Sequence, residues 1–263
     1  MLRHLFKRSL FLLFGLVSLE AFSDEMNPPS RAEITIVAPG FWCPFSCKAS
    51  EGKEGFTIDI LRAIFKPLGK TVRYEDLNYS RALLEVRNGK YNATPSTFKN
   101  EAPDFIYPKL PISRNRYCFY TNINHASWDY TGADSLSGHS IGIVQSYSYG
   151  ALIDDAIKAK IATFEVHSGS DLTYRMAKKV MLKRMEMFVE DENLVQYTMK
   201  SRPDIQLKEA GCEDATYAYF ALSPKRDESP TLAAEFDQGI KRLHLSGELE
   251  KILSVYGLHD WMH

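Results

Sequence analysis

The sequence predicts an α/β fold with room for two lobes, and three observations support this prediction. An apolar strand at 34–38 breaks at Pro39-Gly40 into an aromatic loop, and a helix opens at Gly55. A second unit of the same kind begins at 140, where an apolar strand runs into a turn and then a helix. The chain has 263 residues, and removal of the first 23 leaves 240, enough for one large domain or two smaller ones.

The first 23 residues have the pattern of a secretory signal peptide. Basic residues precede an apolar run at 10–19 that is too short to span a bilayer comfortably, and Ala21-Phe22-Ser23 offers small residues before a cleavage point. An uncleaved membrane anchor is the less favoured alternative. We therefore expect a soluble periplasmic chain that begins at Asp24. Its net charge would be near −3, because the whole chain carries −1 and the removed segment +2, which argues against a nucleic-acid partner.

All four cysteines follow the signal segment, and an even count in an exported chain favours disulfides. Three pairings are possible. Cys43 and Cys47 form the simplest pair, because Pro44 favours the turn that a bridge between them needs. Cys118 would then pair with Cys212 by elimination. A metal site is the weaker alternative, since the cysteines lack zinc-ligand spacing and the histidines do not cluster with them. We expect no metal and no cofactor.

Apolar periodicity and capping signals predict the other elements in order. In the first half they are a helix from 55 with Thr57 as a possible N-cap, a strand at 71–74, a helix at 79–87 closed by Asn88-Gly89, a strand at 91–94 that runs into a polar loop at 95–97, and a strand at 116–121. In the second half they are strands at 140–144, 161–166, 185–189 and 216–222, helices after 150, at 171–181 and through 199, and closing helices at 231–245 and 247–256.

This order of units resembles the bacterial extracellular solute-binding proteins of the amino-acid-binding type. The motifs that carry the resemblance are the helix opening at 55–61 after the aromatic loop, the strand and turn at 140–150, and Ser246-Gly247-Glu248-Leu249 near the C-terminus. The resemblance implies a two-lobed fold with two chain crossings, in which lobe 1 comprises 24–118 plus 223–263 and lobe 2 comprises 119–222. It also implies a monomer that captures a small polar, amino-acid-like ligand between its lobes. The membrane partner would be an ABC transporter permease or a signalling receptor.

Within this resemblance, the candidate ligand-binding residues lie at loops and turns that follow strands. They are Phe41, Trp42, Arg81, Ser96, Thr97, Gln145, Tyr147, Ser148 and Glu190. Glu190, or its neighbour Asp191, would accept the ligand's ammonium group. The turn at 145–150 precedes a helix and would direct N–H groups toward an anion. Purely structural roles are the alternative, because rings can cover a lobe's edge and acidic residues stabilise a helix's first turn.

Two positions depart from the family pattern. Asn92 stands where Asp is usual, and Ala102 stands where an Arg clamps the ligand's α-carboxylate. An ordinary α-amino acid is therefore in doubt as the ligand, because Ala cannot supply a two-pronged cationic donor. Lys99, Arg81 or Arg114 could supply a substitute positive charge.

A lyase is the second class of hypothesis. One branch of this fold, resembling cyclohexadienyl dehydratase, uses a cleft carboxylate for elimination, and Glu190 would act there as a general acid. The sequence has no nucleophile elbow, zinc-binding His pair or phosphate-binding Gly loop. Ligand binding is therefore the main hypothesis.

Overall fold

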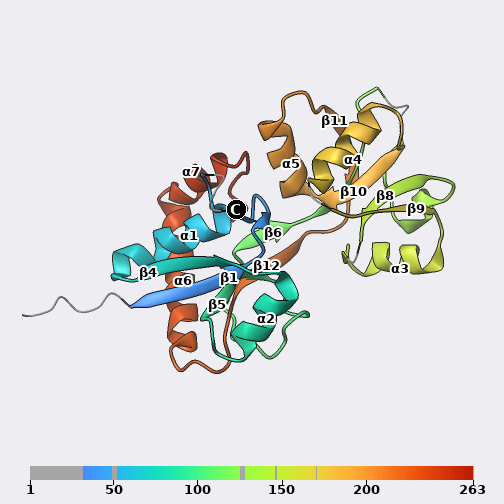
Figure 1. The fold of residues 1–263 in the computed structure, drawn as a ribbon. Coiled ribbons are helices and arrows are strands. Elements are labelled where there is room, and N and C mark those ends of the chain that lie inside the picture. Colours follow the sequence, from blue (N-terminus) through green and yellow to red (C-terminus); the bar gives the residue numbers. More distant parts are fainter. Residues whose placement is uncertain (1–31, 49–51, 125–127, 146, 170, 263) are drawn as a thin grey trace, which may run out of the picture. The chain divides into compact units, whose positions relative to one another are not determined.

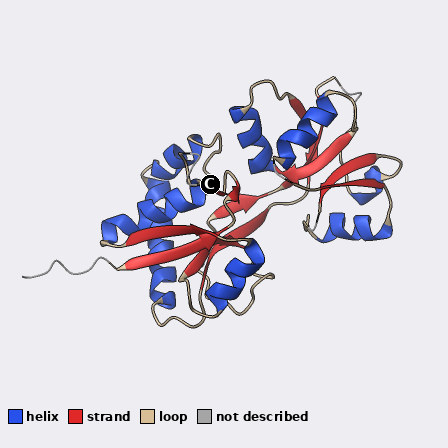
Figure 2. Ribbon diagram, in the orientation of Figure 1, coloured by secondary structure: helices blue, strands red, loops and turns tan. Residues whose placement is uncertain are grey.

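The computed structural model describes residues 32–48, 52–124, 128–145, 147–169 and 171–262, and it contains two five-stranded sheets with helices packed on their faces (Figure 1). The predicted signal peptide at 1–23 lies outside the described residues. None of the helices in the described part combines the length and apolar character that a membrane span needs. Strands and helices alternate along most of the chain, as the sequence predicts (Figure 2).

The first sheet has the strand order β4–β1–β5–β12–β6. Its strands are β1 (Glu33–Ala38), β4 (Thr71–Asp76), β5 (Ala93–Thr97), β6 (Ser113–Asn115) and β12 (Thr216–Leu222). Its helices are α1 (Phe56–Phe65), the short 3-10 helix η2 (Lys66–Leu68), α2 (Tyr79–Arg87), α6 (Ser229–Leu245) and α7 (Glu248–Ser254). Strand β1 runs parallel to β4 and β5, whereas β12 runs antiparallel to β5 and β6.

Alternation along β1 divides the first core between the two faces of this sheet. Ile36 belongs to a cluster with Phe65 of α1 and Phe236 of α6. The next residue, Val37, belongs to a separate cluster with Val86 of α2. Helices α1 and α6 therefore cover one face and α2 the other, which fixes α2 beside the ends of β1 and β5.

The second sheet has the order β11–β7–β10–β8–β9. Its strands are β7 (Tyr117–Asn122), β8 (Ser140–Val144), β9 (Thr163–His167), β10 (Met187–Asp191) and β11 (Leu207–Cys212), and its helices are η3 (Ala133–Leu136), α3 (Ala151–Ala159), α4 (Leu172–Met181) and α5 (Glu192–Ser201). Phe188 of β10 packs with Met176 and Val180 of α4, whereas its neighbour Val189 packs with Ile153 of α3. The period of two again places helices on both faces.

The chain passes between the sheets at 115–117 and at 212–216, and the two passages run side by side. Asn115 pairs with Thr216 in the first sheet, and Cys118 pairs with Cys212 in the second. The predicted Cys118–Cys212 disulfide is confirmed and lies at this crossing, and the Cys43–Cys47 disulfide is confirmed as well. Strand β12 belongs to the first sheet, because it is hydrogen-bonded to β5 and β6, although the predicted lobe limits assign 119–222 to the second lobe.

Two local predictions were wrong. Gly55 is the N-cap of α1, and Thr57 lies inside the helix, where its hydroxyl donates to the Phe45 carbonyl at 2.7 Å. Residues 95–97 belong to β5 rather than to a loop, because Thr97 is paired with Tyr219 of β12. Strands β6 and β11 were not predicted at all.

Candidate functional site

A cavity of about 470 Å³ opens where the ends of several strands from both sheets meet. This volume lies within the range of small-molecule binding sites, roughly 300–1,000 Å³. The described residues that line it are Pro39, Phe41, Trp42, Tyr79, Ser80, Ser96, Phe98, Asn100, Glu101, Tyr117, Gln145, Tyr147, Ser148, Gly150, Glu190, Asp191 and Thr216. They come from the loop after β1, the start of α2, the end of β5, the turn before α3 and the crossing strands.

Aromatic rings form one wall of the cavity. Phe41 and Trp42 make up the short strand β2 (Phe41–Trp42), which pairs with β3 (Ser46–Cys47) inside the loop closed by the first disulfide. The Trp42 ring stacks on Phe45, with ring centroids 4.3 Å apart. The Phe41 ring is 70% exposed. The loop therefore holds one ring in a fixed position and presents another to solvent at the edge of the cavity.

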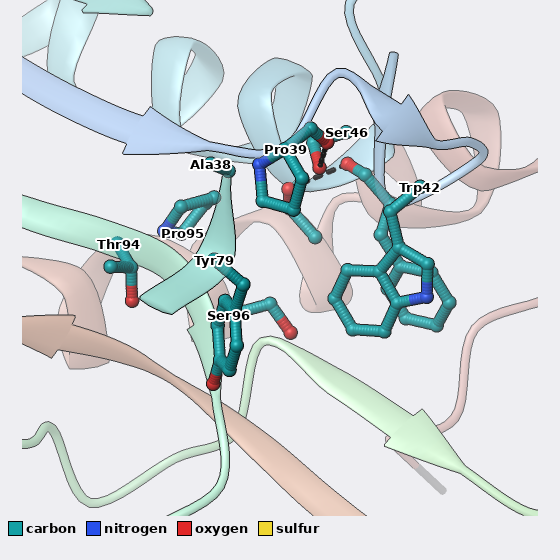
Figure 3. A pocket seen from close by; sticks show the side chains of 10 residues that line it. Ala38, Pro39, Trp42, Ser46, Tyr79, Thr94, Pro95 and Ser96 are labelled. Atoms are coloured by element: carbon teal, nitrogen blue, oxygen red, sulfur yellow. Dashed lines mark hydrogen bonds between the residues drawn. The ribbon is translucent and has the colours of Figure 1, made fainter. Parts of the chain in front are cut away.

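A small hollow of about 10 Å³ adjoins the cavity at the ends of β1 and β5, and Figure 3 shows Trp42, Tyr79 and Ser96 around it. Its size suits one water-sized group. The Ser96 hydroxyl faces no hydrogen-bond partner in the described structure, although Ser96 is only 4% exposed. Ser46, by contrast, donates to the Pro39 carbonyl at 2.7 Å. Ser96 therefore offers an unused hydrogen-bonding group to whatever enters the hollow.

Two buried carboxyl groups at the end of β10 line the cavity on the side of the second sheet. Glu190 accepts hydrogen bonds from the Thr173 hydroxyl at 3.2 Å and the Asp191 backbone N–H at 3.0 Å. Asp191 accepts from the Asn115 side-chain amide at 2.9 Å and from the Asn193 backbone N–H at 2.9 Å, so it also caps α5. Burial raises the pKa of Glu190 to about 8 and that of Asp191 to about 6.

Neutral hydroxyl groups, rather than cations, surround these carboxyl groups. The ring of Tyr117 packs edge-on against Tyr149 at 5.2 Å. Burial, followed by the charge of Glu190, raises the pKa of Tyr147 and of Tyr149. Within the described part of the chain, neither Glu190 nor Asp191 forms an ion pair with a lysine, arginine or histidine. Glu190 and Asp191 thus have no positively charged partner among the described residues.

A third carboxylate lines the cavity on the side of the first sheet. Glu101 accepts a hydrogen bond from the Tyr79 hydroxyl at 2.6 Å and another from the Phe98 backbone N–H at 3.1 Å. These two donors hold the carboxylate in place at the start of α2 without neutralising its charge.

The position at which the resemblance predicts a clamping arginine holds an apolar residue in this chain. Ala102 is fully buried in the cluster that contains Val37 and Ala82. The neighbouring Lys99 places its ammonium over the ring of Tyr219, 4.0 Å from the centroid. Lys99 is not among the residues that line the cavity.

The two other substitute cations proposed from the sequence also lie outside the cavity lining. The Arg114 guanidinium lies 3.7 Å from the Glu192 carboxylate. Arg81 is exposed on α2 and pairs with Glu85 one helical turn away, at 3.4 Å. None of the three candidate cations, Lys99, Arg81 and Arg114, therefore places a positive charge on the cavity lining.

The turn before α3 carries a carboxylate of its own. Asp154 accepts hydrogen bonds from the Ser148 hydroxyl at 2.6 Å and from the Tyr149 backbone N–H at 2.8 Å. The N–H group expected to face a ligand's anion therefore already faces Asp154, from the first turn of α3. The helix dipole favours an anion at this point, and the protein supplies one.

Seven of the nine predicted site residues line the cavity, namely Phe41, Trp42, Ser96, Gln145, Tyr147, Ser148 and Glu190. Arg81 and Thr97 do not. Thr97 is buried, with its hydroxyl 2.5 Å from that of Thr94. The sequence did not identify Tyr79, Phe98, Glu101 and Tyr117 as site residues. Tyr79 and Tyr117 lie at the start of a predicted helix and of a predicted strand, whereas Phe98 and Glu101 follow the predicted loop at 95–97.

One cluster in the described residues has ligand types that suit a metal, and it comprises Cys118, Glu209 and Cys212. Both cysteines are joined in the disulfide, so neither offers a thiolate. The cluster does not fit a metal ion in this oxidised form.

Comparison with known proteins identifies a family over most of the chain. The sequence profile of the bacterial extracellular solute-binding proteins, family 3, matches residues 34–259. No curated protein matches by sequence.

Three similar solved structures illustrate the fold. An ancestral arginine-binding protein bound to arginine is 16% identical, with a TM-score of 0.65 and coverage of 86% of this chain and 98% of that one. The second substrate-binding domain of GlnP from Lactococcus lactis, in an open conformation, is 20% identical, with a TM-score of 0.66 and coverage of 87% and 96%. The L-cystine solute receptor of Neisseria gonorrhoeae, unliganded and open, is 17% identical, with a TM-score of 0.66 and coverage of 88% and 95%. At these identities the likeness shows a common fold.

Proposed function

This chain belongs to the bacterial extracellular solute-binding proteins of family 3, and we propose that it captures a small organic solute in the cavity and presents it to the permease of an ABC transporter. Members of this family are typically periplasmic or secreted, which agrees with the signal-peptide pattern at 1–23. We propose a periplasmic location and a monomeric state for this chain as well. A membrane receptor in place of a permease is the alternative partner.

The observation that supports solute capture is the cavity itself. Its walls combine aromatic rings with a few polar groups of defined orientation, which is the usual composition of a small-molecule site. Residues that line it come from both sheets, which are joined by only two passages of chain. Movement of one lobe against the other about these passages would enclose a solute, and the solute's preference for the enclosed state would shift the equilibrium toward it.

The proposed site residues are the seven predicted ones that line the cavity together with Tyr79, Glu101, Tyr117 and Asp191. The family and the structural neighbours are binding proteins, and they give the lyase hypothesis no support.

A thermal-shift screen tests the proposal directly. The full chain is expressed with its own N-terminus, recovered oxidised from the periplasm, and exposed to amines, amino acids, carboxylates, sugars and short peptides. A bound solute at about 100 times its Kd adds roughly 2.7 kcal/mol to the free energy of unfolding. We expect one chemical class to raise the melting temperature and to be recovered unchanged. If no class does so, solute capture is overturned.

A further inference from the structure

We propose that the solute held in this cavity is an organic cation without a carboxylate, an alkylammonium or guanidinium compound. This inference rests on the proposed function and names the class of solute that the site takes. It follows from the charges, the rings and the one unpartnered hydroxyl group that line the cavity.

The charges of the cavity lining have one sign. The described lining residues include the carboxyl groups of Glu101, Glu190 and Asp191, and they include no lysine, arginine or histidine. Glu190 and Asp191 are nearly inaccessible to solvent, at 1% and 2% exposure. An ionised carboxylate away from water is costly unless a positive charge is near. A cationic solute would supply that charge, whereas a carboxylate on the solute would add a further negative one.

Cations near the cavity are already engaged elsewhere. Arg114 and Arg116 both lie against the Glu192 carboxylate, at 3.7 and 2.8 Å. Lys99 lies over the ring of Tyr219. None of these side chains lines the cavity, so a carboxylate on the solute would find no cationic partner among the described lining residues.

Helix N-termini at the cavity are also engaged, and by groups of the protein. Asp154 occupies the N-terminus of α3, Asp191 caps α5, and the Asn78 side chain caps α2 by accepting from the Arg81 N–H at 3.0 Å. Backbone N–H groups at helix starts are the common uncharged site for an anion. Two of these three ends carry a carboxylate of the chain, which makes them unfavourable to a second anion.

Aromatic rings supply the other half of a cation site. Trp42, Tyr79, Phe98, Tyr117 and Tyr147 line the cavity together with the exposed ring of Phe41. A ring face attracts a cation, most strongly where water is excluded, and tryptophan is the best of the ring types. Glu101 follows β5 of the first sheet, whereas Glu190 and Asp191 lie on β10 of the second, and aromatic residues next to both sheets line the cavity with them.

Ser96 gives an independent indication that a ligand group is needed. Its buried hydroxyl lacks a hydrogen-bond partner in the described structure, and buried polar groups of folded proteins nearly always have one. It lines the hollow of about 10 Å³ beside Trp42 and Tyr79. A primary ammonium head is close to water in size, and it can donate to the hydroxyl oxygen while it lies against the rings.

The test uses pairs of solutes that differ by one carboxylate. Agmatine is arginine without its carboxylate, and putrescine is ornithine without its carboxylate. Isothermal titration of the full oxidised chain with both pairs measures the effect of that group alone. We expect the decarboxylated member of each pair to bind at least tenfold more tightly.

Variants of two lining carboxylates test whether the preference for decarboxylated solutes arises from the cavity. At about pH 9, Glu190→Gln and Glu101→Gln each remove one negative charge from the lining, and each should weaken the binding of the preferred cation at least fivefold. Glu209→Gln is the matched control, because Glu209 lies on β11 outside the cavity lining and is partly exposed. The affinity of the Glu209→Gln variant for the preferred cation should equal that of the unchanged protein.

Each outcome bears on a different statement. Tighter binding of arginine and ornithine than of their decarboxylated partners, or binding of sugars or acids alone, would overturn the cation inference and leave solute capture intact. Absence of binding by every class of solute would overturn solute capture itself. Weakening by Glu209→Gln equal to that by Glu190→Gln would show that the cavity carboxylates are not the binding groups.

Discussion

Binding of a cationic solute should depend steeply on pH, and Glu190 should be the cause. Burial raises the pKa of the Glu190 carboxyl to about 8, and the neighbouring charge of Asp191 acts in the same direction. At neutral pH the carboxyl of the empty protein therefore holds its proton most of the time, and a cation must displace that proton. Because each pKa unit corresponds to a factor of ten, affinity should be about tenfold lower at pH 7 and about a hundredfold lower at pH 6 than at pH 9.

The other titratable groups near Glu190 should not mask this pH dependence of binding. Asp191 follows it on β10, Tyr117 lies on β7, and Tyr147 and Tyr149 lie in the turn before α3. Burial raises the pKa of all three tyrosines, so they stay neutral over the range tested. The pKa of Asp191 is raised to about 6, so a second decline in affinity should begin below that pH.

Titration calorimetry with agmatine measures this effect, because the guanidinium group of agmatine stays charged across the range. Comparison of buffers with different ionisation enthalpies gives the number of protons released, which should be close to one per agmatine at about pH 7. In Glu190→Gln the residual affinity should change little between about pH 7 and pH 9, without proton release. Equal affinity of the unchanged protein over that range, or release of no proton, would show that ionisation of Glu190 does not control binding.

The stability of the empty protein should also depend on the protonation of Glu190. The folded pKa of Glu190 is raised above its ordinary value of 4.5 to about 8. The contribution of the Glu190 carboxyl to the free energy of unfolding is therefore fully present below about pH 4.5 and is lost as pH rises toward about 8. At about 1.4 kcal/mol per unit, the loss is at most about 5 kcal/mol. Without ligand, Glu190→Gln should thus unfold at higher denaturant concentration than the unchanged protein at about pH 9, and the difference should shrink at about pH 5.

Three further predictions concern other parts of the chain. Replacing both Cys118 and Cys212 by Ala should lower the free energy of unfolding by about 4 kcal/mol in denaturant titrations, because the bridge closes a loop with a sequence separation of 94; an unchanged midpoint would contradict this. Trp42→Leu should weaken agmatine binding about three- to thirtyfold in calorimetry, since it removes the best ring of the wall while leaving an apolar side chain. Asn92→Asp should destabilise the fold by about 1–3 kcal/mol at neutral pH, because the amide that donates to Glu228 becomes a second carboxylate. Glu228→Gln in the same chain should restore most of that loss, and failure to do so would count against this pairing.

Elements with a strong local pattern could be predicted from the sequence to within a few residues. Helix α2 begins and ends where predicted, and strand β8 coincides with its predicted range. Strand β11 was missed because its residues, with Lys208, Glu209 and Gly211, have no apolar alternation. Its extended form comes from pairing with β7 and from the disulfide at Cys212, which are contacts distant in sequence.

The two predicted site residues that lie outside the cavity lining each have a neighbour that lies on it. Ser96 lines the cavity, whereas the Thr97 side chain is buried with its hydroxyl 2.5 Å from that of Thr94. The sequence pattern predicted a loop here, so this contact between two hydroxyl groups of β5 could not be anticipated. On α2, Tyr79 and Ser80 line the cavity, and Arg81 is turned away by about a further 100° of helix and pairs with Glu85. Chain position alone therefore placed both segments at the cavity, but it did not show which side chain of each segment lines it.

The two departures from the family pattern have different physical meanings. Asn92 serves the fold, because its side chain accepts from the Thr35 backbone N–H at 2.8 Å and donates to Glu228 at 2.9 Å, which joins β1 to the start of α6. Ala102 affects the site because it stands where the family pattern has an arginine. Its side chain packs in an apolar cluster, and no other cation is found among the described residues that line the cavity. The described lining of the cavity therefore carries three carboxyl groups, Glu101, Glu190 and Asp191, and no cation. A solute that binds there must carry the positive charge itself, and a carboxylate attached to that solute would meet repulsion where related proteins are expected to offer a clamp.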